Sequence, residues 1–183
     1  MYEKVTPAQY AAIADEAHKN GMRVIAHIFN LEDGKGLLRA NFDAFAHGVR
    51  DKDVDEEYMT LIRQHPNVVV IGRSLGSGIA VHLASLRPIA RLVLVTPYDS
   101  LAELAASQFP FFPVRWLLLD KYESWRYAAQ VTAPTLIIAA GRDEVIPRAS
   151  TEALYARFKY GVATLKVIAG ESHNTISGSP EYA

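Results

Sequence analysis

The sequence contains no cysteine among its 183 residues. This absence excludes a disulfide scaffold, a thiolate metal site and a cysteine nucleophile, and it fits a reducing compartment. An excess of either charge is also lacking, because 19 basic side chains stand against 20 acidic ones. The chain therefore offers no basic surplus for nucleic acid or for an anionic membrane.

Long apolar runs are absent as well, and none reaches the roughly 18 residues of a membrane span. The first ten residues, MYEKVTPAQY, lack the apolar core of a signal peptide. We therefore expect a soluble, cytoplasmic protein with neither a membrane span nor a nucleic-acid partner. The composition does not indicate an oligomeric state.

The sequence does contain a regular alternation of strand-like and helix-like segments. Half of its residues are apolar, which suits one folded domain over residues 1–183. Short apolar runs alternate with helical patterns, and these runs occupy residues 22–28, 42–46, 67–71, 92–95, 135–139 and 164–168. The spacing predicts an α/β fold, a three-layer doubly wound sheet of about six parallel strands. We expect the strand order 2-1-3-4-5-6, with its reversal between the first and third strands.

The segment Gly72-Arg73-Ser74-Leu75-Gly76 lies between a predicted strand and a predicted helix. This is the setting of a nucleophile elbow, in which a G-x-S-x-G turn projects the serine hydroxyl above the sheet edge. Ser74 is therefore a candidate nucleophile, and the Leu75 amide is a candidate hydrogen-bond donor to an oxyanion. The alternative is a Gly/Ser turn that serves only strand-to-helix packing.

A serine nucleophile needs a base, and the base needs a residue that orients it. Asp143 follows the predicted strand at residues 135–139, and His173 follows the predicted strand at residues 164–168. Both therefore lie at the sheet edge expected for Ser74, in the chain order Ser, Asp, His. Taken separately, Asp143 fits a turn or capping residue, and His173 fits an exposed loop histidine.

Several longer motifs in residues 67 to 182 extend this pattern, namely GRSLGSG, TPYDSL, FPFFPV, KYES, APTLIIAAGRDEVIP and GESHN. With them the segment resembles a serine α/β-hydrolase of the BEM46-like and ABHD-type group. The resemblance implies Ser74 as nucleophile, His173 as general base and acid, Asp143 as its orienter and Leu75 as one oxyanion donor. We expect hydrolysis of a small ester through an acyl-enzyme, without a cofactor. The aromatic stretch FPFFP at residues 109–113 forms either part of an acyl pocket or part of the core.

The first 66 residues do not fit that family, because its oxyanion loop of the His-Gly type is missing. The stretch from AIADEAHKNG to HPNVVVI resembles instead a segment of a metal-dependent amidohydrolase, a TIM barrel of the imidazolonepropionase or prolidase type. The resemblance implies His27 and His47 as metal ligands. Two histidines fall short of the three protein ligands of a stable zinc site, so no native metal site is expected. They can hold an adventitious metal, or they are partly buried polar residues.

The chain thus resembles two halves of unrelated enzymes, residues 1–66 and 67–183, joined near residues 65–71. Its last residues read as a helix start with almost no helix after it, which fits excision, so we interpret the chain as an engineered chimera rather than a natural fusion. The second oxyanion donor would come from the first half, at the amide of Phe29, and losing one donor costs about 10²–10³ in rate. We expect a weak esterase on small activated esters. The alternative is an engineered scaffold without significant activity.

Overall fold

The computed structural model of the chain describes residues 5–46, 48–65 and 68–182. The chain divides into two compact units, Met1–Pro66 and Asn67–Ala183. Within the described residues, none of the helices has the length and apolar character needed to cross a bilayer. The elements of the first unit are α1 (Pro7–Lys19), β1 (Ile25–Ala26), α2 (Leu31–Arg39), β2 (Ala44–Phe45) and α3 (Glu56–Arg63).

The first unit has a small core, built where its helices meet the β1–β2 pair. β1 and β2 are parallel, with Ile25 opposite Ala44. One buried cluster joins α1 to the segments that follow it, and its members are Ala14, Ile28, Leu37 and Phe42. A second buried cluster joins α2 to α3, and its members are Leu31, Leu38 and Tyr58.

Lys35 of α2 is buried in the first unit, with its side chain only 5% exposed. Its Nζ atom lies 2.6 Å from Asp55 Oδ2, 2.9 Å from Glu57 Oε2 and 3.2 Å from Glu32 Oε1. The hydrogen bond to the Asp55 carboxylate raises the pKa of Lys35, and the same ammonium lowers the pKa of Asp55 and of Glu57. The paired charges therefore tie α2 to the start of α3, because Asp55 is also the N-terminal cap of α3.

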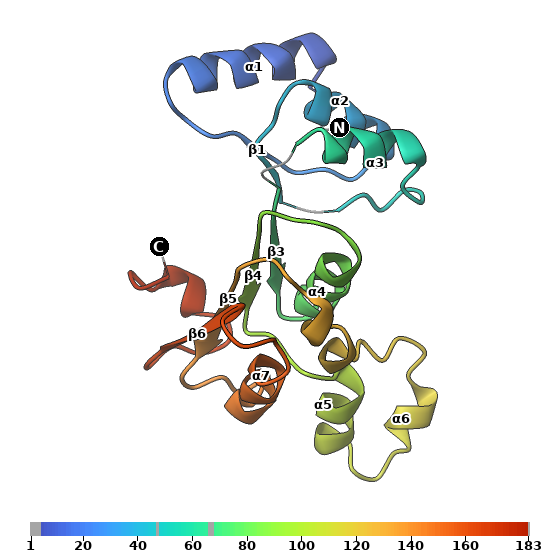
Figure 1. Cartoon of the computed structure of the whole chain (residues 1–183), viewed down its shortest axis with the longest axis vertical. Coiled ribbons are helices and arrows are strands. Elements are labelled where there is room, and N and C mark those ends of the chain that lie inside the picture. Colours follow the sequence, from blue (N-terminus) through green and yellow to red (C-terminus); the bar gives the residue numbers. More distant parts are fainter. Residues whose placement is uncertain (1–4, 47, 66–67, 183) are drawn as a thin grey trace. The chain divides into compact units, whose positions relative to one another are not determined.

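The second unit is built on a parallel sheet (Figure 1). Its strands β3 (Val69–Arg73), β4 (Arg91–Val95), β5 (Thr135–Ala140) and β6 (Ala163–Ile168) pair in the order β3-β4-β5-β6. Helical segments connect them, and these are α4 (Gly76–Leu86), α5 (Leu101–Gln108), α6 (Val114–Leu117), η1 (Ser124–Arg126), η2 (Ala128–Gln130) and α7 (Arg148–Tyr155), with η3 (Ile176–Gly178) after β6. All carboxyl ends of the strands therefore lie at one edge of the sheet.

The two faces of this sheet are covered by different segments, because successive side chains of a strand point to opposite faces. On one face α4 and α7 pack over a core that includes the deeply buried Val81, Leu92, Leu94, Ile137 and Leu154. On the other face η3 contributes Ile176 to a smaller cluster with Val95, Ile138, Ala140 and Ile168. The site side chains described below come from loops at the strand ends between these two layers.

α4 packs closely on the sheet because the residues it turns inward are small. Ser77, Gly78, Ala80, Val81 and Ala84 are its buried residues. Its larger apolar side chains face outward instead, with Ile79, Leu83 and Leu86 being 55%, 40% and 62% exposed.

The predicted α/β class is confirmed, with parallel strands that alternate with helices. The expected neighbours are paired in β1-β2 and in β3-β4-β5-β6, but the expected single sheet is wrong, because the six described strands form two sheets. The physical reason lies in the first two strands. The apolar runs at residues 22–28 and 42–46 form strands of only two residues each, which supply too few ladder hydrogen bonds to extend a sheet.

Candidate active site

Ser74 occupies the sharp turn between β3 and α4, and its backbone has a φ of +49°. A positive φ is rare outside glycine and marks backbone strain at a functional turn. The Ser74 amide donates to the Val95 carbonyl of the neighbouring strand at 2.9 Å, which fixes the turn against the sheet. A side chain at Gly72 would bring its Cβ within 2.6 Å of the Ala80 Cβ, so the close crossing of α4 over β3 requires glycine there.

The structure brings the three predicted side chains together in one hydrogen-bonded row. His173 Nε2 lies 2.9 Å from Ser74 Oγ, and His173 Nδ1 lies 3.0 Å from both carboxylate oxygens of Asp143. The side chains of His173 and Asp143 are 9% and 3% exposed, while Ser74 is partly exposed. A carboxylate only accepts hydrogen bonds, so the proton of the imidazole belongs on Nδ1 and Nε2 is free to accept from the hydroxyl.

Asp143 is held by its own loop as well as by His173. Its Oδ1 atom accepts hydrogen bonds from the Val145 amide at 2.9 Å and from the Ile146 amide at 2.7 Å. Such an Asx turn fixes the carboxylate before any partner binds. The two interpretations of Asp143, as a turn residue and as the residue that orients His173, are therefore compatible.

The backbone of His173 is held by two residues that sequence reasoning missed. Its amide donates to Glu144 Oε2 at 3.3 Å, and its carbonyl accepts from an Nη atom of Arg73 at 3.1 Å. Both residues adjoin predicted site residues, and this adjacency was the only available signal. The loop of the candidate base is thus tied both to the elbow and to the aspartate loop.

Two further side chains missed from the sequence hold the elbow from inside. The hydroxyl of Ser77 donates to the Ser74 carbonyl at 2.6 Å, and the hydroxyl of Tyr98 donates to the Leu75 carbonyl at 3.0 Å. Burial raises the pKa of Tyr98, so its phenol stays a neutral donor. Leu75 itself caps the N-terminus of α4, which is the end of a helix that favours negative charge.

The remaining predicted residues lie in the first unit. Phe29 has a side chain that is 59% exposed, and its carbonyl accepts from the Arg50 amide at 2.9 Å. An oxyanion role for the Phe29 amide stays a prediction. His47 lies outside the described residues, so the expectation that His27 and His47 form no native metal site, and hold at most an adventitious metal, also stays a prediction. Among the residues that the structure does describe, no group of three or more potential metal-binding side chains occurs.

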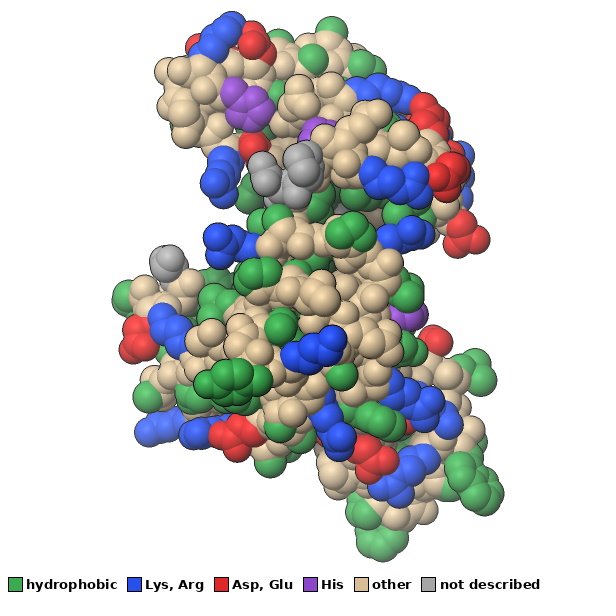
Figure 2. Space-filling view, in the orientation of Figure 1, with side chains coloured by type: hydrophobic (Ala, Val, Ile, Leu, Met, Phe, Trp, Pro, Cys, Tyr) green, Lys and Arg blue, Asp and Glu red, His purple; other side chains and the backbone are tan. Residues whose placement is uncertain are grey.

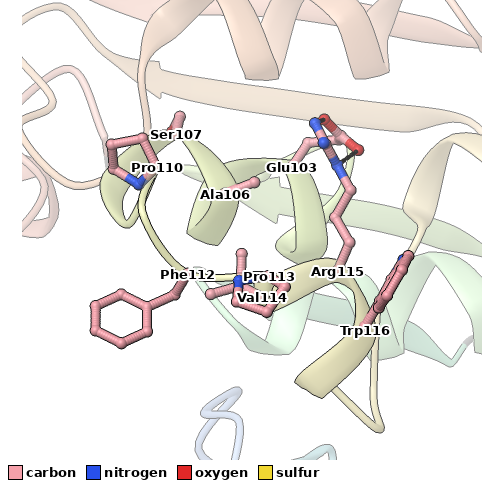
Figure 3. A pocket seen from close by; sticks show the side chains of 9 residues that line it. All are labelled: Glu103, Ala106, Ser107, Pro110, Phe112, Pro113, Val114, Arg115 and Trp116. Carbon is pink, nitrogen blue, oxygen red and sulfur yellow. Dashed lines mark hydrogen bonds and ion pairs between the residues drawn. The ribbon is translucent and has the colours of Figure 1, made fainter.

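The aromatic stretch at residues 109–113 is not part of the core, because Phe111 and Phe112 are 95% and 64% exposed. It borders a pocket of about 380 Å³ between α5 and α6 (Figure 3). The pocket is lined by Glu103, Ala106, Ser107, Pro110, Phe112, Pro113, Val114, Arg115 and Trp116. Glu103 and Arg115 form a two-pronged ion pair with N–O distances of 2.8 and 2.6 Å, which lowers the pKa of Glu103.

Two curated proteins similar to this chain are each about three times as long as the part that matches it. An uncharacterized protein of Mycobacterium tuberculosis is 47% identical over 89 residues, which are 49% of this chain and 32% of that protein. The Caenorhabditis elegans alpha/beta hydrolase domain-containing protein aho-3 is 33% identical over 115 residues, 63% of this chain and 33% of that protein. The chain thus spans about a third of the length of these curated relatives. No protein-family model matches it.

Solved structures decide the fold. The monoacylglycerol lipase of Paleococcus ferrophilus superposes with a TM-score of 0.52 at 18% identity, over 87% of this chain and 88% of that one. An alpha/beta hydrolase enzyme from a Medee basin deep-sea metagenome library superposes with a TM-score of 0.53 at 14% identity, over 87% and 85%. The chain has an α/β-hydrolase-like fold. Within that fold, the carboxyl ends of the strands carry the Ser74–His173–Asp143 row.

Proposed function

We propose that the chain is a serine hydrolase that cleaves small activated esters through a covalent acyl-enzyme. The observation that carries this proposal is the unbroken row from Ser74 Oγ through His173 to Asp143, with spacings of 2.9 and 3.0 Å. The positive φ of Ser74 supports it, because the strained turn presents the hydroxyl at the sheet edge. The name of the relative aho-3, an alpha/beta hydrolase domain-containing protein, and the fold shared with a lipase are consistent with the same chemistry.

In the first half of the reaction, Ser74 Oγ attacks the ester carbonyl carbon and its proton passes to His173 Nε2. The carbonyl oxygen becomes an oxyanion in the tetrahedral intermediate. The intermediate collapses by breaking the bond to the alcohol oxygen, which takes the proton back from His173 and leaves. Asp143 keeps the imidazole in the required tautomer and stabilises its positive charge while the proton is held.

In the second half, water replaces the alcohol. His173 removes a proton from the water, whose oxygen attacks the acyl carbon, and the acid is released as Ser74 regains its proton. The Leu75 amide is the proposed donor to the oxyanion in both halves, since it follows the nucleophile at the N-terminus of α4. Loss of one oxyanion donor costs about 10²–10³ in rate, so activity is weak where the Leu75 amide acts without a second donor.

An inactive engineered scaffold is the second candidate. The observation in its favour is the division of the chain into two compact units at residues 66–67. The scaffold would keep the triad geometry and lack a complete oxyanion hole. The proteins and structures compared above lend no support to a chimera or to an amidohydrolase-like first segment.

Rapid-mixing kinetics with p-nitrophenyl acetate test the proposal. We expect an initial burst of p-nitrophenol as acyl-enzyme accumulates, followed by slower steady turnover. Ser74→Ala and His173→Ala should both abolish the burst, while Ser85→Ala, which changes a partly exposed serine near the far end of α4, should keep it. A slow rate that is equal in all four proteins would contradict the proposal and favour the inactive scaffold.

A further inference from the structure

We propose that Ser77 is a positioning residue of the oxyanion hole, which holds and polarises the peptide that ends in the Leu75 amide. This inference rests on the proposed esterase function. Ser77 is fully buried, with 0% of its surface exposed, and is the second residue of α4. Its hydroxyl and its amide both donate to the Ser74 carbonyl, so it acts through the backbone of the elbow.

The direction of the Leu75 N–H follows from the peptide that joins Ser74 to Leu75. The Ser74 carbonyl and the Leu75 N–H belong to one planar trans peptide, so they point in opposite directions. Ser77 binds that carbonyl twice, through its hydroxyl at 2.6 Å and through its amide at 2.9 Å. Holding the oxygen on the inner side of the turn fixes the direction in which the N–H points.

The same hydrogen bonds also make the Leu75 N–H a stronger hydrogen-bond donor. A hydrogen bond accepted by a peptide oxygen polarises the peptide and makes its N–H a better donor. The next peptide is held too, because the Tyr98 hydroxyl donates to the Leu75 carbonyl at 3.0 Å. The peptides on both sides of Leu75 are therefore fixed by buried hydroxyl groups, and the amide is preorganised before substrate binds.

A serine in a helix commonly donates its hydroxyl to a carbonyl of the preceding turn, and the Ser77 bond differs only in that its acceptor is the carbonyl of the elbow. Ser85, later in α4, donates from its hydroxyl to the His82 carbonyl at 2.6 Å, the same bond three residues back. Ser85 is only partly buried, and its bond lies near the other end of the helix, away from the elbow. Ser85→Ala is therefore a matched control that removes an equal hydrogen bond without touching the elbow peptide.

The test compares an oxygen ester with its thionoester, in which sulfur replaces the carbonyl oxygen. Sulfur accepts hydrogen bonds weakly, so hydrolysis of the thionoester draws little on the oxyanion hole. We expect Ser77→Ala to lower kcat for the oxygen ester about threefold to tenfold with KM unchanged. The thionoester rate should change by less than about twofold. Ser85→Ala should leave both rates unchanged.

A second variant guards against general damage to the fold. Ser77→Cys keeps nearly the volume of the side chain and replaces the hydroxyl with a weak donor, so its oxygen-ester rate should fall between those of the parent and Ser77→Ala. Equal losses on both esters, or an oxygen-ester rate at the parent level, would overturn the role of Ser77 and leave the esterase proposal standing. If the parent protein shows no turnover that depends on Ser74, the esterase proposal is overturned, and this inference with it.

Discussion

The guanidinium of Arg73 donates a hydrogen bond at 3.1 Å to the backbone carbonyl of His173, across 100 positions of sequence. Arg73 is the last residue of β3 and directly precedes Ser74. The bond therefore couples the strand of the proposed nucleophile to the loop of the proposed base. The His173 amide is held on its other side by Glu144 at 3.3 Å. The candidate base is thus fixed through its backbone as well as through its ring.

Replacing Arg73 tests this coupling. Arg73→Met keeps the apolar stem and removes the donor, and we expect kcat for an activated ester to fall about threefold to tenfold as His173 loses its anchor. Arg73→Lys should restore part of the rate, because an ammonium can still donate. Arg148→Met is the control, since it breaks only the exposed pair of Arg148 with Glu152. A parent-like rate for Arg73→Met would show that the bond does not position the base.

Asp143→Asn separates orientation of the imidazole from simple packing. The amide oxygen can still accept from the Val145 and Ile146 amides, but its NH₂ group would donate to His173 Nδ1. The ring would then carry its proton on Nε2 and could not accept from Ser74. We expect kcat to fall by about 10³–10⁴-fold, with the far-UV circular dichroism spectrum unchanged. The exposed Asp120→Asn variant should keep the parent rate. A loss of less than about tenfold would contradict the orienting role.

The buried Lys35 predicts a pH dependence of stability in the first unit. The Lys35 ammonium lowers the pKa values of Asp55 and Glu57. Their ionised carboxylates therefore stabilise the folded state fully at pH values above their ordinary pKa range. This stabilisation is lost as the pH falls through their lower folded-state pKa values, because the carboxylates then take up protons. Thermal unfolding followed from pH 7 to about pH 3 should show this loss.

Lys35→Met should flatten that dependence and lower the unfolding midpoint at pH 7, because it leaves neighbouring carboxylates without their cation. Lys52→Met, at an exposed position, serves as the control. An identical pH dependence in the parent and in Lys35→Met would contradict the assigned role of the ion cluster.

The candidate triad could be predicted because its positions follow from topology. Parallel strands place their carboxyl ends at one edge, so Ser74, Asp143 and His173 each had to follow a strand of one sheet. The strain at Ser74 was also foreseeable, since the flanking glycines mark a sharp turn. The supporting contacts were not foreseeable. Whether Ser77 bonds to the elbow or to water depends on the turn geometry, which no spacing rule encodes.

The sheet order was harder to predict because apolar runs do not report how long a strand becomes. Residues 22–28 have the composition of a buried strand, yet only Ile25–Ala26 pair. The burial of the aromatic stretch at residues 109–113 was also hard to predict. Phe111 lies 95% exposed, and the hydrophobic side chains of this region project at the surface (Figure 2). Burial there depends on the neighbouring segments, which the residues themselves do not reveal.

Labelling by a fluorophosphonate tests the central claim most directly, because such probes phosphonylate a serine only where a base activates it. The parent protein should gain the mass of one probe, and peptide mapping should place the adduct on Ser74. His173→Ala should label at least about 100-fold more slowly, and Ser74→Ala should not label. An adduct formed equally by the parent and Ser74→Ala, or no adduct on the folded parent protein, would contradict the account.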